Sequence, residues 1–542
     1  SLTASSGNLT INNKVGALDL VNSTLNAALG SVTLLGGAID LNNSQLTAAQ
    51  ALTLRAQRGA GANISSSNSH LIARQGGISL TGLNGAGIRL SGTSTITAQQ
   101  DILLQATAAA VNISGPNTTS MSTLTSNMGN IRIAGNGTRR NLNAVHINNL
   151  ALTAERGRIS VIGVSDGSSY GGPTGNGIVL SNTVVFNASE NSVVGRHITY
   201  TDSQVAAVAI GGGARANITF IGNTSIDAES DYASGLLFNT KYEPAAILTF
   251  QNGTASIKGK TLKPGALGAH NSAGVANGAW RNKISEPEII VNNATLGITA
   301  SSYDVDGMAS FRVHSSDTPD DGARWSGYKF SGDGDVNITA TSNSGDGINL
   351  RLFDNTRLTG KLTILGESQS GAGVSVPEFG NVSLVNASIT GRSQTGSGIL
   401  MNAGDIYGKK INLNGNVLNG TSASGSGIDI HGNNVSITNG SLNGTSQGNG
   451  AGVQLTGGSN YTIDGATLNG HSRGGVGVSI GGNLTLANGV LAGVTLTGSG
   501  VNITGNVNSA NTTISGRAIG RGNGVELAGT VSGGNISGAA IV

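Results

Sequence analysis

The 542-residue sequence predicts an all-β fold, a single-chain right-handed parallel β-helix (β-solenoid) of about 25 residues per coil with longer loops in the middle. Three observations lead to this prediction: a glycine signature at a nearly fixed period, short runs in which apolar and polar residues alternate, and the lack of helical periodicity. A period of roughly 20–50 residues is typical of repeat proteins, in which each repeat buries its apolar face by stacking on its neighbours.

The glycine signature fills the C-terminal part of the chain. Gly-x-Gly followed by Ile or Val occurs eight times, and the second glycines are 26, 25, 29, 25, 25, 23 and 24 residues apart. These second glycines are Gly347, Gly373, Gly398, Gly427, Gly452, Gly477, Gly500 and Gly524.

One repeat, from Val435 to Leu455, indicates what a coil contains. Its sequence, VSITNGSLNGTSQGNGAGVQL, has three short apolar–polar alternations separated by Asn, Gly, Ser and Thr. Such alternation predicts strands, the Gly/Asn clusters predict turns, and no run is long enough for a crossover helix. We therefore expect three short strands per coil, with Leu, Ile and Val inward and Thr, Ser, Asn and Gln outward. Asn and Gly at the corners tolerate left-handed backbone angles, and stacked Asn side chains can hydrogen-bond between coils.

The N-terminal part carries a second version of the same period. The phrase Ser/Thr-x-Leu/Ile-x-Ala and its weaker copies have central apolar residues that are 23, 21, 25, 25, 28 and 28 residues apart. These residues are Leu2, Leu25, Leu46, Leu71, Ile96, Leu124 and Leu152. One unit therefore runs through nearly the whole chain, and about 21 coils spaced about 4.8 Å apart would form a rod on the order of 100 Å long.

Three other architectures fit the sequence less well. A doubly wound α/β sheet needs helices between strands that read as continuous apolar runs. A membrane β-barrel needs strands of about 9–11 residues and aromatic girdles, whereas aromatic residues make up 3% of this chain. A disordered linker would be consistent with 86 glycines, but not with 37% hydrophobic residues at a fixed period and only 11% charged residues.

The composition favours a secreted protein and excludes several kinds of site. No cysteine occurs, which excludes disulfides and Cys-based sites and suits secretion in an unfolded form. Thirty Lys+Arg against 28 Asp+Glu give a net charge of +2, so we expect no nucleic-acid partner. The seven histidines lack the spacing of zinc ligands, so we expect no metal and no cofactor. We also expect no membrane span, because no apolar run approaches about 18 residues.

The repeats resemble a known family. The segments NSTLNAALGSVTLLGG and NSHLIARQGGISLTG are similar to the filamentous-haemagglutinin-type repeats of bacterial exoproteins secreted by the two-partner pathway. This group includes haemagglutinins, large adhesins and the stems of contact-dependent growth-inhibition effectors. The resemblance is clearest from Ser1 to about Gly163, and the coils from about Val336 to Val542 look like related Gly/Asn-rich coils of the same exoproteins.

The resemblance implies an extracellular stem or binding segment of a Gram-negative exoprotein. The family's N-terminal secretion domain, with its Asn-Pro-Asn-Leu-type motif, has no match here, and no C-terminal toxin is recognisable. The chain begins inside a repeat without a signal peptide and ends without a polar cap, so we expect a piece of a longer protein. The implied partner for secretion is an outer-membrane two-partner transporter that would recognise the missing N-terminal domain.

The sequence divides into four regions. Residues 1–165 form a β-helix with haemagglutinin-type repeats, 166–231 irregular coils, 232–335 aromatic-rich coils with loop excursions, and 336–542 regular Gly/Asn-rich coils. Between Tyr232 and Phe330 lie ten of the 18 aromatic residues, including both tryptophans. The repeat glycines are also 39, 33 and 40 residues apart there; they are Gly235, Gly274, Gly307 and Gly347.

The candidate ligand-binding residues lie in this middle region. The stretches GAWRNKISEP and DTPDDGARWSGYKF each place a Trp beside an Arg, with Lys close by. This combination suits recognition of a sugar ring or a protein surface, although the rings could instead cover a widened core. The candidates are Trp280, Arg281, Lys283, Tyr303, Arg324, Trp325, Tyr328 and Lys329.

Carboxylates raise the alternative of catalysis, because polysaccharide-degrading β-helices gather carboxylates from adjacent coils. Asp227, Glu229 and Asp231 alternate in sequence and could share a face. Weaker groups are Asp304 with Asp306, and Asp317 with Asp320 and Asp321. All could equally be solvated turn residues, and no cluster lines up with another one coil later. We therefore expect no enzymatic activity and no catalytic residues.

The sequence thus favours an extracellular rod-like adhesin segment of a secreted bacterial exoprotein. Its partner would be a cell-surface carbohydrate or receptor protein on a host or neighbouring cell, bound through the middle region. Two alternatives stay open: the stem of a growth-inhibition effector that recognises an outer-membrane receptor or lipopolysaccharide, and a polysaccharide-degrading enzyme. Repeated weak contacts along a stem would add by avidity.

Overall fold

The computed structural model describes residues 1–57, 63–137, 143–166, 175–198, 205–211, 215–240, 246–263, 273–279, 287–303, 305–310, 327–350, 352–376, 381–403, 410–458 and 460–541. These residues form strands and turns with no helix among them, so the all-β prediction is confirmed. It follows that none of them belongs to a helix capable of crossing a membrane. The chain divides into two compact units: unit 1 is Ser1–Ser272 with Pro287–Leu296, and unit 2 is Ala273–Glu286 with Gly297–Val542.

Unit 1 is built from strands of very different lengths, from 3 residues in β1 to 21 in β16. They are β1 (Leu2–Ala4), β2 (Leu9–Val21), β3 (Thr24–Ala27), β4 (Val32–Asn42), β5 (Gln45–Ala48), β6 (Leu52–Ala56), β7 (Asn63–Ser67), β8 (His70–Ala73), β9 (Ile78–Gly82), β10 (Gly87–Ser91), β11 (Thr95–Ala98), β12 (Ile102–Ala106), β13 (Val111–Ser114), β14 (Ser122–Ser126), β15 (Ile131–Gly137), β16 (Val145–Ser165), β17 (Ile178–His197), β18 (Ala206–Ile210), β19 (Ala216–Ser230), β20 (Ser234–Thr240) and β21 (Ile247–Thr261). Strand β23 (Glu288–Ser302) begins in unit 1 and ends in unit 2.

Unit 2 is built from short strands throughout. They are β22 (Val275–Ala279), β24 (Met308–Ser310), β25 (Tyr328–Gly332), β26 (Asp335–Ser342), β27 (Ile348–Asn349), β28 (Leu352–Leu358), β29 (Leu362–Ser368), β30 (Val374–Val376), β31 (Asn381–Val385), β32 (Ala387–Ser393), β33 (Ile399–Ala403), β34 (Ile411–Asn414), β35 (Val417–Ser422), β36 (Ile428–Gly432), β37 (Asn434–Thr438), β38 (Ser441–Ser446), β39 (Val453–Thr456), β40 (Asn460–Asp464), β41 (Thr467–Ser472), β42 (Val478–Ile480), β43 (Asn483–Ala487), β44 (Val490–Thr495), β45 (Val501–Ile503), β46 (Val507–Ala510), β47 (Thr513–Ala518), β48 (Val525–Leu527), β49 (Val531–Ser532) and β50 (Asn535–Ala540).

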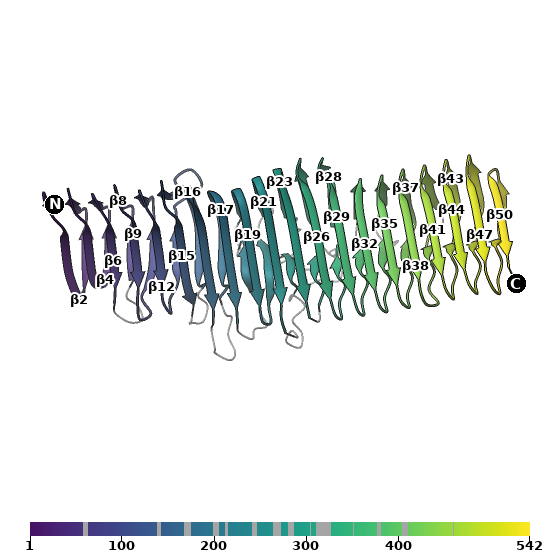
Figure 1. Cartoon of the computed structure of the whole chain (residues 1–542), viewed down its shortest axis with the longest axis horizontal. Coiled ribbons are helices and arrows are strands. Elements are labelled where there is room, and N and C mark those ends of the chain that lie inside the picture. Colours follow the sequence, from purple (N-terminus) through teal and green to yellow (C-terminus); the bar gives the residue numbers. More distant parts are fainter. Residues whose placement is uncertain are drawn as a thin grey trace, which may run out of the picture. The chain divides into compact units, whose positions relative to one another are not determined.

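Within each unit, strands pair in parallel with the corresponding strands of the coils before and after them. In unit 1, β5 pairs with β3 and β8, and in unit 2, β38 pairs with β35 and β41. Successive coils therefore lie in layers, a solenoid-like arrangement that is visible in Figure 1 as strands following one another side by side. Most strands have both edges hydrogen-bonded, which leaves few free edges within a unit.

The register of pairing follows the sequence period. In unit 1, the central apolar residues of the N-terminal phrase are direct partners from Leu2 through Leu152. In unit 2, the residue after each signature glycine pairs with its counterpart one coil later, from Ile348 through Val525. In these two sets of coils, the period read from the sequence is thus the period of the structure.

The core consists of the inward-facing residues of these ladders. Leu46, Leu71 and Ile96 are 0% exposed. Where the coils of unit 1 lengthen, Phe186, Phe220 and Phe250 pair in register and stack, with ring centroids 4.5 and 5.6 Å apart. Burial of each such side chain stabilises the fold by roughly 1.5–3 kcal/mol.

The signature glycines mark a corner where strands approach too closely for a side chain. A Cβ atom on Gly427 would lie 2.2 Å from the amide nitrogen of Thr445 in the next coil. A Cβ on Gly420 would lie 2.1 Å from the carbonyl oxygen of Gly427. Both contacts are to backbone atoms, which explains why glycine recurs here once per coil.

One serine of most coils is buried, so the expectation that serines face outward is wrong at this position. The Oγ of Ser422 donates to the carbonyl of Gly396 (2.6 Å) in the preceding coil and accepts from the amide of Gly425 (2.8 Å) in its own turn. A hydroxyl can donate and accept at once, so each serine links two coils. The buried serines of this column in unit 2 are Ser342, Ser368, Ser393, Ser422, Ser446 and Ser472.

The same device occurs in the N-terminal phrase. Ser44 and Ser69 are buried, and the amide of Ser44 donates to the Oγ of Ser69 at 3.0 Å. Because a buried polar group is tolerated when it is hydrogen-bonded, this ladder explains why the phrase begins with Ser.

The predicted roles of asparagine are confirmed. Asn22, Asn43 and Asn68 occupy corners with φ between 48° and 49°. Along the outside of unit 2, Asn443 donates to Asn419 (3.0 Å) in one neighbouring coil and accepts from Asn469 (2.9 Å) in the other.

The later coils of unit 1 differ from the predicted pattern of three short strands. Strand β16 runs for 21 residues and β17 for 20, with register shifts where they bend. One bend lies at Asn149, whose φ of 47° turns the strand without ending it. Extra residues are absorbed in this way as irregularities within continuous strands, and the side chain of Asn149 bonds to Gly115, 34 residues away.

Candidate functional site

The structure describes three of the eight residues predicted to bind a ligand. Tyr303 and Lys329, both in unit 2, are 49% exposed and half-buried respectively. Tyr328 is 1% exposed, its hydroxyl donates to the carbonyl of Ala309 (3.2 Å), and burial raises its pKa. Its ring therefore packs in the core and does not form part of an exposed binding surface. This agrees with the alternative that the aromatic rings of the middle region cover a widened core. The other five predicted residues, Trp280, Arg281, Lys283, Arg324 and Trp325, lie outside the described residues.

The weaker carboxylate groups lie partly outside the described residues as well. Asp304, Asp317, Asp320 and Asp321 are not described. Asp306 accepts the amide of Asp346 (2.8 Å), which in turn accepts the amide of Ala372 (2.7 Å). Burial raises the pKa of Asp346. These two aspartates therefore hold turns together across coils.

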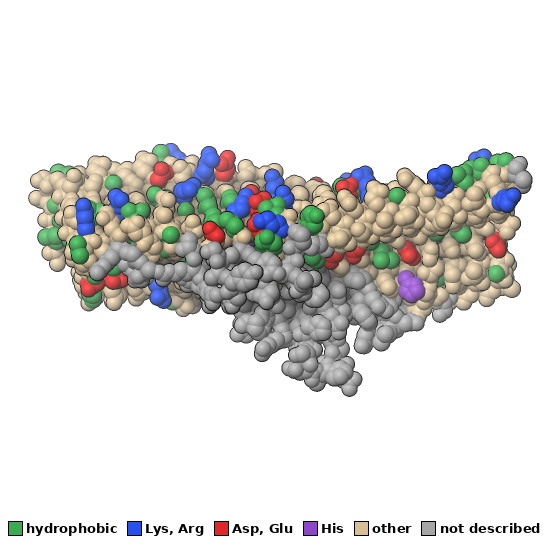
Figure 2. Space-filling view, turned by 90° about the horizontal axis from the view of Figure 1, so that it is seen from below, with side chains coloured by type: hydrophobic (Ala, Val, Ile, Leu, Met, Phe, Trp, Pro, Cys, Tyr) green, Lys and Arg blue, Asp and Glu red, His purple; other side chains and the backbone are tan. Residues whose placement is uncertain are grey.

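The strongest carboxylate candidates lie on one face, as predicted. Asp227, Glu229 and Asp231 are half-buried, and the residues between them on β19 are buried. Together with Arg196, Lys258, Lys260 and Lys263 from the adjacent coils, they form a cluster in unit 1 that we term the charged patch. On the face shown in Figure 2, basic and acidic side chains are interspersed on a surface that otherwise consists mostly of backbone and of side chains that are neither charged nor hydrophobic.

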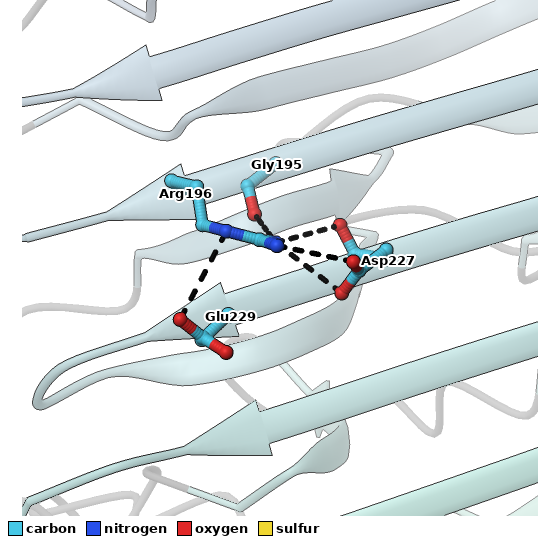
Figure 3. A network of polar contacts seen from close by, with 4 residues as sticks. All are labelled: Gly195, Arg196, Asp227 and Glu229. Atoms are coloured by element: carbon cyan, nitrogen blue, oxygen red, sulfur yellow. Dashed lines mark hydrogen bonds and ion pairs between the residues drawn. The ribbon is translucent and has the colours of Figure 1, made fainter.

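Arg196 of β17 binds both acidic residues of β19 (Figure 3). Its guanidinium donates through Nη1 to Oδ1 of Asp227 (3.2 Å) and through Nη2 to Oδ2 (3.0 Å), and its Nε lies 3.9 Å from Glu229 Oε1. Nη1 also donates to the carbonyl of Gly195 at 3.0 Å. The hydrogen bond to Asp227 raises the pKa of Arg196.

The bidentate geometry fixes the orientation of Arg196 more than it stabilises the fold. Bidentate pairs between Arg and a carboxylate are geometrically specific. The side chains of Arg196 and Asp227 are 31% and 40% exposed, and pairs this accessible to solvent contribute about 0–1 kcal/mol.

The coil after the acidic residues carries lysines. Lys258 is the register partner of Asp227, and Lys260 is the partner of Glu229; both are exposed. Lys263 forms an ion pair with Asp231 at 2.5 Å, and its Nζ lies 5.1 Å from the ring centroid of Tyr232. The charged patch therefore consists of a layer of negative charge between two layers of positive charge.

The charged patch combines a carboxylate that is already engaged with ammonium groups that face solvent. Asp227 is held by the guanidinium of Arg196, so its carboxylate is already engaged. Lys258 and Lys260 present two ammonium groups on the solvent side of one strand. These two groups, one coil beyond the carboxylates that Arg196 holds, can contact the carboxylates, phosphates or hydroxyls of a surface ligand.

The basic residues of the charged patch were not predicted from the sequence as neighbours of the carboxylates. The signal that could have identified them is their spacing from those carboxylates along the chain. Arg196 hydrogen-bonds to Asp227, which lies 31 residues later, and Asp227 is the register partner of Lys258, another 31 residues later. A period of about 25 residues therefore misaligns these three coils. Among the described residues, no group of three or more His, Cys, Asp and Glu side chains could hold a metal ion.

Comparisons with protein families, with curated proteins and with solved structures identify no match for this chain.

Proposed function

We propose that this chain is an extracellular segment of a secreted bacterial exoprotein, in which a right-handed parallel β-helix of about 25 residues per coil serves as a stem and as an adhesive surface. The observation that carries the proposal is the row of identical outward groups that recurs once per coil, as in Asn419, Asn443 and Asn469. A surface that repeats with the backbone offers the same weak contact many times, and such contacts add by avidity.

The internal construction of each unit supports the role of a stem. Successive coils are joined by parallel backbone pairing, by the buried serine column and by side-chain amide ladders. The resemblance of the repeats to filamentous-haemagglutinin-type coils supports the same role and implies export through a two-partner transporter. We place the protein on the bacterial cell surface or in the medium.

The partner in this proposal is a carbohydrate or a receptor protein on a host or neighbouring cell. The charged patch is the part of unit 1 best equipped for contact, because Lys258 and Lys260 are exposed. Surface glycans and lipopolysaccharide carry carboxylates and phosphates, which lysine binds as a point charge. The tryptophans Trp280 and Trp325 remain sequence-based candidates for the same function.

We expect the double substitution Lys258→Gln with Lys260→Gln to weaken binding of the chain to whole cells by about tenfold, because it removes two exposed charges. Its thermal melt should match the wild type, since neither side chain is part of the core. Flow cytometry of labelled chain on bacterial and host cells measures the effect.

The matched control is Arg55→Gln with Arg74→Gln, which removes the same charge from exposed positions elsewhere in unit 1. If binding falls equally in both variants, the loss is caused by the change in net charge and not by the charged patch. Absence of wild-type binding to every cell type would contradict the proposed function. Binding to bacteria but not to host cells would identify the stem as that of a growth-inhibition effector.

A further inference from the structure

A polar groove runs across several coils of unit 2. Its volume is about 410 Å³, within the range of about 300–1,000 Å³ that is common for small-molecule sites. The lining residues come from five successive coils and include Glu367, Gln369, Arg392, Gln394, Thr421 and Gln447.

The groove arises from the alternation of side chains around the buried serine column. Ser368 and Ser393 point inward, so the residue before each serine and the residue after it point outward. The residues before the serines form one row, in which Glu367, Arg392 and Thr421 are register partners. The residues after them form the second row.

The first row carries an ion pair and the second carries unpaired amides. Glu367 Oε1 and Arg392 Nη1 lie 2.8 Å apart across adjacent coils. The side-chain amides of Gln369, Gln394 and Gln447 are exposed and make no hydrogen bond with any described residue. In unit 1, by contrast, the side-chain amide of Gln50 donates a hydrogen bond from Nε2 to Oε1 of Gln75 at 2.8 Å. The groove of unit 2 therefore offers donors and acceptors that the protein does not use.

The lining excludes several classes of ligand. A peptide could not extend the sheet here, because β29 already pairs with both β26 and β32. The single Arg is balanced by the single Glu, so the groove does not attract a polyanion. Ala423 is its one apolar lining residue, which leaves little surface for a lipid or an apolar peptide.

We propose that this groove binds an uncharged linear glycan that lies across the coils. Amides, hydroxyls and a paired guanidinium and carboxylate match the alternating donors and acceptors of sugar hydroxyl groups. The rows repeat at the coil spacing of about 4.8 Å, which is close to the length of one pyranose residue along a glycan chain. Each coil would thus contact about one sugar residue. The inference rests on the proposed function in one respect: the proposed function places the glycan on a cell surface.

Titration calorimetry of the whole chain with linear oligosaccharides of one to six residues tests the inference. The probes are β-1,4-, β-1,3- and α-1,4-linked glucose, β-1,4-linked N-acetylglucosamine, and oligogalacturonate as the acidic comparison. Affinity for at least one neutral series should rise with chain length and level off near five residues, because the lining spans five coils. No binding of any neutral series, or tighter binding of the acidic one, would overturn the proposal.

Substitutions locate the binding. Gln369→Ala with Gln394→Ala should weaken it about tenfold, because two hydrogen-bonding groups are lost. Gln454→Ala, on the outward face of β39 away from the groove, should leave it unchanged. Ala423→Gln fills the gap in the second row and should tighten binding severalfold. Equal affinity in all four proteins would place the glycan elsewhere and overturn the inference.

The same variants on cells separate this inference from the proposed function. Cell binding that is lost with the lysine double variant but kept with the glutamine double variant would support adhesion and contradict the role of the groove. Oligosaccharide binding by a chain that binds no cell would support the groove and contradict adhesion.

Discussion

Gly427→Ala should lower the free energy of unfolding of unit 2 by about 3 kcal/mol or more, the upper end of the usual range for overpacking. The added Cβ would lie 2.2 Å from the amide nitrogen of Thr445 and 2.7 Å from the carbonyl oxygen of Gly452. Since all atoms in contact are backbone, no side chain can rotate away, and the coils on either side must separate.

Hydrogen exchange and thermal melting measure this effect. In a repeat structure, damage to one coil is expected to open its neighbours first, so amides of β36 and β38 should lose protection before the rest of unit 2. Gly481→Ala is the matched control, because its Cβ would meet nothing closer than 3.5 Å. That substitution should leave the melt unchanged or raise it slightly. Equal melts for both variants would contradict the close approach at the signature glycine.

Acidification should destabilise unit 1 through His197. The imidazole is buried, with Nδ1 3.3 Å from Ser230 Oγ. Burial lowers its pKa from 6.5 to about 4, although the carboxylate of Asp231 opposes the shift. The unfolded chain therefore binds a proton between these pH values when the folded chain does not. The contribution of the neutral imidazole to the free energy of unfolding is fully present above pH 6.5. It is lost as the pH decreases towards 4, by about 3 kcal/mol in total.

The measurement is the free energy of denaturant unfolding as a function of pH between 7 and 4. His197 lies between Ser165 and Ser230, its register partners in the two neighbouring coils. The substitution His197→Ser therefore continues the column of hydroxyl groups. This substitution should lower the free energy of unfolding at neutral pH, because it leaves a cavity. It should also make that free energy depend less on pH between 7 and 4. His70→Ser removes an exposed imidazole and should retain the wild-type profile. A profile for His197→Ser parallel to the wild type would show that other groups cause the acid sensitivity.

The period and the inward residues could be predicted from the sequence because both depend on local alternation. Leu46, Leu71 and Ile96 stand at equal intervals, and equal intervals in a stacked structure place residues beside one another. The burial of Ser69 could not be predicted in the same way. A serine is polar on any hydropathy scale, and only the geometry of the turn indicates that its hydroxyl has two backbone partners.

The candidate site was only partly predictable, because coil length varies. Alternation placed Asp227 and Glu229 on one face, but Arg196 and Lys258 come from coils that are longer than the common period. The burial of Tyr328 depends on its packing and on the carbonyl of Ala309, neither of which has a signature in sequence. The groove of unit 2 needed the three-dimensional register, since its rows combine residues about 25 positions apart.

Both candidate surfaces use the same position of the coil. Glu229 in unit 1 and Glu367 in unit 2 each precede a buried serine, and each lies beside an arginine from a neighbouring coil. The outward position before the serine column therefore carries an acidic residue of both candidate surfaces, on a backbone that the column holds in register.

The central claim, that neighbouring coils stack in parallel register, can be tested most directly with pairs of introduced cysteines, because the chain has none of its own. Asn443→Cys with Asn469→Cys places two thiols on outward register partners, whose Cα atoms lie within the range of about 4.4–6.8 Å that a disulfide spans. Asn443→Cys with Asp464→Cys is closer in sequence but joins β38 to β40 on another face. Under mild oxidation the first pair should form an intramolecular disulfide and the second should not; free thiols in the first pair, or a disulfide in the second, would contradict the stacked coils.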